Sequence, residues 1–168
     1  MRNTNNLSYA AKEVYAHDSA RYLLSLFVAE PAREKLLTLY ALNSELAGIH
    51  RAVREEMIGH IRYAWWQEII EGLYDGTVRA GHPISEALAP IIVSGILPQA
   101  ELMKLVEAYR STYPQMPDVN AIIENLSLIL LRALKPESIP AFQKASNIIA
   151  RHKGGKAWLS LKLLLAGF

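Results

Sequence analysis

Apolar residues recur at helical spacing along most of this chain, and proline and glycine fall mainly between the periodic stretches. This pattern is typical of amphipathic helices separated by turns, whereas a half-buried strand would alternate apolar and polar residues. No alternating stretch bounded by turn residues occurs in the sequence. The spacing therefore predicts an all-α fold, with helices over residues 19–28, 31–51, 56–74, 82–93, 98–113, 118–134 and 139 to the end.

Several predicted helix boundaries carry residues that suit helix ends. Asp18 can cap the helix that follows it by accepting a hydrogen bond from its first turn. Asp75-Gly76 should end the third helix, because glycine tolerates left-handed backbone, and His82-Pro83 should begin the fourth. The helix over 118–134 is apolar nearly all round from Leu126 to Leu131, which predicts that it lies at the centre of the bundle.

Length and composition favour one folded domain that does not bind nucleic acid. The 168 residues suit a single domain over 1–168, with residues 1–16 expected to be flexible or peripheral. Hydrophobic residues make up 51% of the chain and the net charge is only +2, which argues against disorder and against a basic nucleic-acid surface. Cysteine is absent. The N-terminus has no apolar signal segment and no apolar run could span a bilayer, so we expect a cytoplasmic protein.

Catalytic and metal-binding motifs are almost absent. The sequence contains no GxSxG, HExxH, EF-hand or P-loop pattern. Glu68, Glu71 and Asp75 stand at helical positions i, i+3 and i+7, where three carboxylates could together hold Mg²⁺ and a diphosphate. The alternative interpretation is a solvated helix face.

The C-terminal part combines basic charge with a strongly apolar end. Residues 141–168 include five basic residues and no acid, and the last twelve residues would span only about 18 Å as a helix, too short to cross a bilayer. This segment is either a buried last helix or a surface that meets an anionic membrane or a partner protein through Lys153, Lys156 and Lys162. Its apolar end also suggests a homo-oligomer formed through the C-terminus.

Five sequence pieces, in this order and spacing, resemble the squalene/phytoene synthase family. They are the residues His17-Asp18-Ser19-Ala20-Arg21-Tyr22, LTLYALNSELAGI (37–49), IRYAWWQEIIEGLYDG (61–76), His82-Pro83 and GKAWLSLKLLLAG (155–167). The resemblance implies an isoprenoid-synthase-like helical bundle, truncated at the C-terminal side. Active members condense two prenyl diphosphates with the help of Mg²⁺ held by two aspartate-rich motifs. Those metal ions neutralise the charge that develops as diphosphate leaves.

The positions that match both aspartate-rich motifs have lost their metal-binding side chains. The first motif follows a Tyr-Ala lead at Tyr40-Ala41, and its arginine and three aspartate positions are Ser44, Ala47, Gly48 and Arg51. The polar positions of the second motif are Leu159, Lys162, Leu165 and Ala166. The loss of every carboxylate predicts a protein that lacks a metal cofactor and is not an enzyme. The alternative is a prenyltransferase in which Mg²⁺ binds elsewhere.

Other residues resemble a non-catalytic branch of the family, which includes respiratory complex I assembly factors and their bacterial relatives. The shared features are Asn43-Ser44-Glu45-Leu46-Ala47, Ile61-Arg62, the pair Trp65-Trp66 and Gly155-Lys156-Ala157. This resemblance implies a chaperone-like or scaffold role at an inner membrane.

A remnant cavity or interface is expected to involve Tyr40, Asn43, Glu45, Arg62, Trp65 and Trp66. Asn43 and Glu45 either line that cavity or lie on the outer face of their helix. Neighbouring residues of a helix point about 100° apart, so one of Trp65 and Trp66 should be core and the other rim or interface. Arg62 should pair with an acid or stack on Trp66.

Taken together, the sequence predicts a non-catalytic binding or assembly protein, peripheral to a membrane, whose partner is a protein or the membrane surface. Two alternatives remain open at this stage. One is a prenyltransferase of the phytoene or squalene type, and the other is a module that binds an isoprenoid lipid without converting it. A prenyl lipid or prenyl diphosphate is the small molecule that these alternatives imply.

Overall fold

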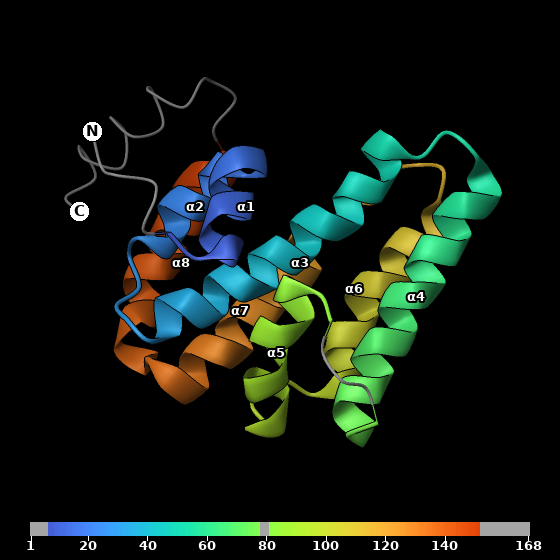
Figure 1. Cartoon of the computed structure of the whole chain (residues 1–168). Coiled ribbons are helices and arrows are strands. Elements are labelled where there is room, and N and C mark those ends of the chain that lie inside the picture. The colour runs from blue at the N-terminus through green and yellow to red at the C-terminus, as the bar shows by residue number, and fades with distance from the viewer. Residues whose placement is uncertain (1–6, 78–80, 152–168) are drawn as a thin grey trace.

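Helices joined by short turns make up the computed structural model, which describes residues 7–77 and 81–151 and contains no strand within those ranges (Figure 1). The all-α prediction is confirmed. The helices are α1 (Tyr9–His17), α2 (Ser19–Ser25), α3 (Ala32–Ala52), α4 (Glu56–Asp75), α5 (Pro83–Val93), α6 (Gln99–Thr112), α7 (Asn120–Leu134), the short 3-10 helix η2 (Pro136–Ser138) and α8 (Ile139–Ala150).

The predicted helix signals act as expected at three boundaries. The Asp18 carboxylate accepts a hydrogen bond from the Arg21 N–H and so caps α2. Gly76 ends α4 in the left-handed conformation, with φ of 69°. The His82 side chain accepts a hydrogen bond from the Ile84 N–H, which holds the imidazole at the N-terminal end of α5.

The centre of the bundle is α3. Figure 1 shows it crossing the molecule diagonally, with α1, α2 and α8 around one end and α4 and α6 at the other. It packs against α1, α2, α4, α5, α6 and α7, and 13 of its 21 residues are buried. The prediction that α7 is central is therefore wrong. Leu128 and Ile129 of α7 are only half-buried, and its Asn125 and Arg132 are exposed.

Residues 1–16 were expected to be flexible or peripheral, and the part of them that the structure describes contributes a helix packed against the core. Tyr9–His17 forms α1, which buries Ala10, Ala11 and Val14 and packs closely along α3. Alanine carries too little apolar surface to give a clear amphipathic stripe in the sequence. It nevertheless allows two helix backbones to approach closely, and this brings Tyr9 beside α3.

The C-terminal predictions can be compared with the structure only as far as residue 151. α8 begins at Ile139 as predicted, while residues 152–168 lie outside the described residues. That range includes the second-motif positions Leu159, Lys162, Leu165 and Ala166, as well as Lys153 and Lys156. Within the described ranges, none of the helices has the length and hydropathy needed to cross a membrane.

Candidate functional site

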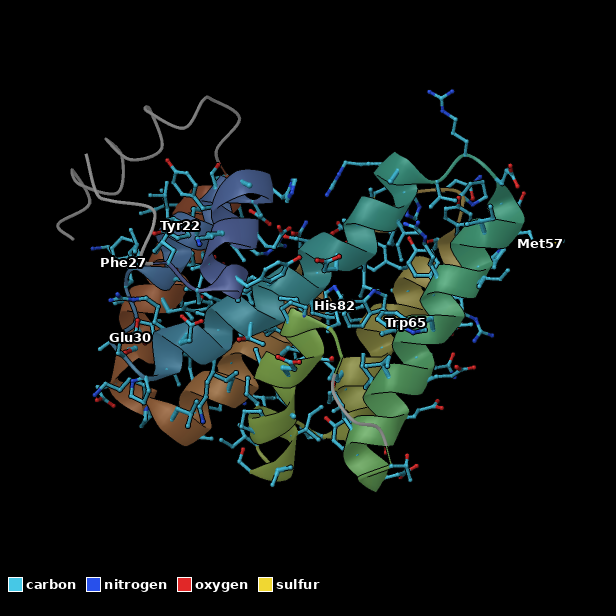
Figure 2. All side chains as sticks on the ribbon, in the orientation of Figure 1. Tyr22, Phe27, Glu30, Met57, Trp65 and His82 are labelled. Atoms are coloured by element: carbon cyan, nitrogen blue, oxygen red, sulfur yellow. The ribbon has the colours of Figure 1, made fainter. Side chains whose placement is uncertain are left out.

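A pocket of about 450 Å³ opens between α3, α4 and the start of α5. We call it the tryptophan pocket, and it is lined by Glu45, Gly48, Ile49, Ala52, Arg62, Trp65, Trp66 and His82. Figure 2 shows Trp65 on α4 and His82 at the start of α5 on the two sides of the space between these helices. Of the six residues predicted for a cavity or interface, the structure brings Glu45, Arg62, Trp65 and Trp66 together here.

Three aromatic rings form one corner of the tryptophan pocket. The ring centroids of Trp65 and Trp66 are 5.0 Å apart, and the two planes meet at 72°. His82 lies 5.1 Å from Trp66 at 77° and 6.1 Å from Trp65 at 74°. The three ring planes are thus nearly perpendicular to one another. Trp66 is buried and Trp65 is 42% exposed, which confirms that one tryptophan is core and the other rim.

Glu45 is the only carboxylate among the residues that line this pocket. Its Oε1 accepts a hydrogen bond of 3.1 Å from the Tyr9 hydroxyl and lies 3.9 Å from His82 Nε2. The His82 Nδ1 accepts the Ile84 N–H, so the ring proton of a neutral His82 is on Nε2 and faces Glu45. Burial, together with the negative charge of Glu45, raises the pKa of Tyr9 to about 12. The glutamate is therefore positioned by side chains from α1 and α5.

Tyr9 and His82 are two polar residues of the site that were not predicted from the sequence, in addition to the apolar lining residues Ile49 and Ala52. His82 carried a signal, because His82-Pro83 marks a helix start and belongs to the family resemblance. Its cap geometry fixes where the ring must lie. Tyr9 carried no such sequence signal, because its position depends on the packing of α1 against α3, a helix that lies further along the chain.

The positions matching the first aspartate motif lie on the stretch of α3 that approaches the tryptophan pocket, and none supplies a carboxylate. Gly48 lines the pocket and Ala47 is buried. The Oγ of Ser44 is buried without a hydrogen-bond partner in the described part of the chain. Arg51 is exposed, and its guanidinium donates a hydrogen bond of 3.4 Å to the Ser44 carbonyl.

The sequence profile of the squalene/phytoene synthase family matches residues 14–122, a range that includes every residue lining the tryptophan pocket. This chain belongs to the squalene/phytoene synthase family. The match begins inside α1 and extends to the start of α7, so it also includes α3, the helix at the centre of the bundle.

Two curated relatives share a stretch of about 100 residues with this family member. A Dictyostelium discoideum protein named NADH dehydrogenase (ubiquinone) complex I, assembly factor 6 homolog is 24% identical over 100 residues, which are 59% of this chain and 28% of that protein. The human protein named NADH dehydrogenase (ubiquinone) complex I, assembly factor 6 is 28% identical over 99 residues, which are 59% of this chain and 29% of that protein. The match thus spans less than a third of either relative. No solved structure matches the chain.

The magnesium site that active members of the family use does not fit the side chains found here. Among the described residues, no three histidine, aspartate or glutamate side chains are placed to hold one metal ion. The carboxylates of the alternative cluster do not form such a group: Glu68 and Asp75 are exposed, while Glu71 accepts a hydrogen bond from Gln67 on the same helix. Regular spacing along a helix places carboxylates on one side but does not make their oxygens converge on one point.

Tyr40 and Asn43 lie away from the tryptophan pocket, in the core. Asn43 accepts a hydrogen bond of 2.8 Å from the buried Tyr109 hydroxyl, so it lies neither in this pocket nor on an outer face. Tyr40 lines a separate groove of about 420 Å³ between α2, α3, α7 and α8. Its hydroxyl lies 3.3 Å from that of Ser127, and burial raises its pKa.

Arg62 has neither of its predicted partners. It lines the tryptophan pocket and is exposed, and it makes no hydrogen bond, ion pair or ring contact with any described residue. The pocket therefore presents a guanidinium and a carboxylate that do not pair with each other.

Proposed function

We propose that this chain is a non-catalytic member of the squalene/phytoene synthase family that acts in binding or assembly, in the manner of a complex I assembly factor. The observation that carries the proposal is the composition of α3 beside the tryptophan pocket. Ala47, Gly48 and Arg51 stand at the aspartate positions, and Glu45 is the one carboxylate in the pocket wall.

Diphosphate chemistry depends on charge neutralisation. Departure of a diphosphate is fast only when divalent ions neutralise its growing negative charge, and those ions need several carboxylate oxygens. Glu45 offers one carboxylate, which already accepts a hydrogen bond from the Tyr9 hydroxyl and faces His82. The remaining wall of the pocket is mainly apolar and aromatic, as in sites that hold a ligand or a partner side chain.

The relatives support an assembly role through their names, which describe assembly factors of complex I. On this proposal the partner is a protein of that assembly process, and the chain works at the surface of an inner membrane. Lys153, Lys156 and Lys162 would supply contacts to that membrane or partner, and an apolar C-terminus would favour self-association.

Deletion of the gene from its native host tests the assembly role. We expect less fully assembled complex I on native gels and less membrane NADH dehydrogenase activity, both restored by the wild-type gene. An unchanged amount of assembled complex I in the deletion strain would contradict the proposal.

A parallel assay tests the enzymatic alternative. Purified protein with farnesyl diphosphate and Mg²⁺ should form no condensed product, and its melting temperature should not rise, because only a ligand that binds the native state stabilises it. Product formation would replace the assembly role with a prenyltransferase. A prenyl lipid that copurifies with the protein, detected by native mass spectrometry, would instead favour the lipid-binding alternative.

A further inference from the structure

Opposite charges and aromatic rings meet in the tryptophan pocket in an arrangement that is suited to a zwitterion. Glu45 and Arg62 both line the pocket, and no ion pair joins them. The second carboxylate oxygen of Glu45 also lacks a hydrogen-bond partner among the described residues. The pocket therefore offers one negative group and one positive group to whatever occupies it.

The aromatic corner selects the kind of cation. A quaternary ammonium has no N–H to donate, so proteins recognise it by the faces of aromatic rings and by nearby negative charge. Trp65 and His82 have partly exposed rings whose planes meet at 74°, and the buried Trp66 packs against both. Glu45 provides the negative charge, 3.9 Å from the His82 ring nitrogen. Arg62 is the group that can bind an anion, because a guanidinium forms paired hydrogen bonds with phosphate oxygens.

Beside the pocket, α4 carries an apolar stripe that no described residue covers. Its members are exposed by 75% at Met57, 41% at Ile58, 60% at Ile61 and 42% at Trp65. Figure 2 shows Met57 at the outer end of α4 and Trp65 further along the helix, beside the space that His82 faces. Trp65 belongs to both the stripe and the pocket, so the two are continuous. Apolar side chains with a tryptophan at the rim are typical of helices that lie in a membrane interface.

We propose that the tryptophan pocket binds the phosphocholine headgroup of a membrane lipid, with the apolar stripe of α4 lying in the lipid interface. The trimethylammonium group rests against the rings of Trp65 and His82, next to Glu45, and the phosphate contacts Arg62. The pocket volume of about 450 Å³ falls within the range of about 300–1,000 Å³ that is usual for small-ligand sites. This binding does not depend on the assembly role, and either can hold without the other.

Calorimetric titration of the purified full chain with phosphocholine, choline and inorganic phosphate tests the site itself. We expect phosphocholine to bind at least tenfold more tightly than choline or phosphate alone, because it reaches both charged groups. Glu45→Gln keeps an oxygen that can accept a hydrogen bond from the Tyr9 hydroxyl but removes the charge, and it should weaken the binding of phosphocholine and of choline at least tenfold. Arg62→Gln should weaken the binding of phosphocholine while leaving the affinity for choline unchanged. The matched control is Arg132→Gln, at an exposed arginine on α7, which should leave both affinities unchanged.

Cosedimentation with vesicles tests whether the source of the headgroup is a lipid. We expect the wild-type chain to sediment with phosphatidylcholine vesicles, and soluble phosphocholine to release it. Ile61→Ser should reduce sedimentation without changing the affinity for soluble phosphocholine. Val93→Ser, at an equally apolar residue of α5 that is 83% exposed, should alter neither.

Several results would overturn the inference. Equal affinity of the wild-type chain for phosphocholine, choline and phosphate would exclude a zwitterion site, and this comparison needs no variant to fold. Undiminished phosphocholine binding by both Glu45→Gln and Arg62→Gln would place the ligand elsewhere. Binding of soluble phosphocholine without sedimentation on phosphatidylcholine vesicles would remove the lipid as its source.

Discussion

Ser44 shows at the scale of one residue how this chain departs from the metal-binding members of its family. It occupies the arginine position of the first motif and is 5% exposed, and its hydroxyl oxygen has no hydrogen-bond partner in the described part of the chain. A buried hydroxyl without a partner loses its hydration and gains nothing in return. The family's polar position has therefore become a local source of instability.

Replacing Ser44 should consequently stabilise the protein. We expect Ser44→Ala to raise the free energy of unfolding by about 1 kcal/mol, because it removes the unsatisfied hydroxyl and introduces a better helix former. Urea unfolding followed by circular dichroism measures the change. The matched control is Ser127→Ala in α7, where the buried hydroxyl donates a hydrogen bond of 2.6 Å to the Ile123 carbonyl. An equal gain in both variants would show that helix propensity alone is responsible.

At the scale of an element, two glycines within helices have opposite surroundings. A Cβ added to Gly59 in α4 would lie 2.6 Å from the Tyr113 hydroxyl oxygen and closer still to its ring. That ring packs against His50, His60 and Tyr63, so it has little freedom to move aside. A Cβ added to Gly48 in α3 would have the Arg51 guanidinium as its nearest neighbour, at 3.7 Å. The two helices therefore accept a methyl group to very different extents.

The same substitution should then have opposite signs at the two positions. Gly59→Ala should lower the free energy of unfolding by roughly 1–3 kcal/mol, because overpacking outweighs the gain in helix propensity. Gly48→Ala should raise it by about 0.5–1 kcal/mol. Thermal or urea unfolding of the two variants measures both changes. A stabilised Gly59→Ala protein would mean that Tyr113 does not pack against α4 as described.

The elements were predictable where one helix carries its own signal. Asp18, Gly76 and His82 mark helix ends by side-chain or backbone chemistry that acts within a few residues, and all three do so in the structure. The position of α7 was not predictable from its apolar sequence, because centrality depends on how many neighbours a helix meets. α3 holds the centre through small residues such as Ala41 and Ala47, which let other helices approach.

The tryptophan pocket was predictable only in part for the same reason. Glu45, Arg62, Trp65 and Trp66 were singled out by their residue types and by the family resemblance. Tyr9 was missed because it joins the site through the packing of α1 along α3. Asn43 was predicted to lie in a cavity or on a surface, but it accepts a hydrogen bond from the Tyr109 hydroxyl. A local sequence pattern cannot predict a contact between residues 66 positions apart.

Across the whole molecule, the hydroxyls of buried and half-buried tyrosines link the outer helices to the core by hydrogen bonds. Tyr109 on α6 donates to Asn43 on α3, and Tyr63 on α4 donates to the Leu46 carbonyl. Tyr74, also on α4, donates to the Leu97 carbonyl near the start of α6. Burial raises the pKa of both Tyr74 and Tyr109 to about 12, since the charged phenolate would be poorly hydrated there. Each of these hydroxyls must stay protonated to keep its hydrogen bond.

The stability of the whole fold should therefore fall at alkaline pH. An unfolded tyrosine loses its proton near pH 10, below the folded pKa of about 12, so the stabilisation is complete below pH 10 and is lost progressively as pH rises to 12. The loss attributable to Tyr109 should be on the order of 2 kcal/mol.

Tyr109→Phe removes this titration but also leaves the buried Asn43 without its donor, so at pH 7 it should be less stable than wild type by roughly 1–3 kcal/mol. Urea unfolding at a series of pH values measures the difference in free energy of unfolding between the two proteins. This difference should be constant from pH 7 to 9 and should narrow between pH 10 and 12. A difference that stays constant up to pH 12 would contradict the raised pKa and, with it, the burial of Tyr109 between α3 and α6.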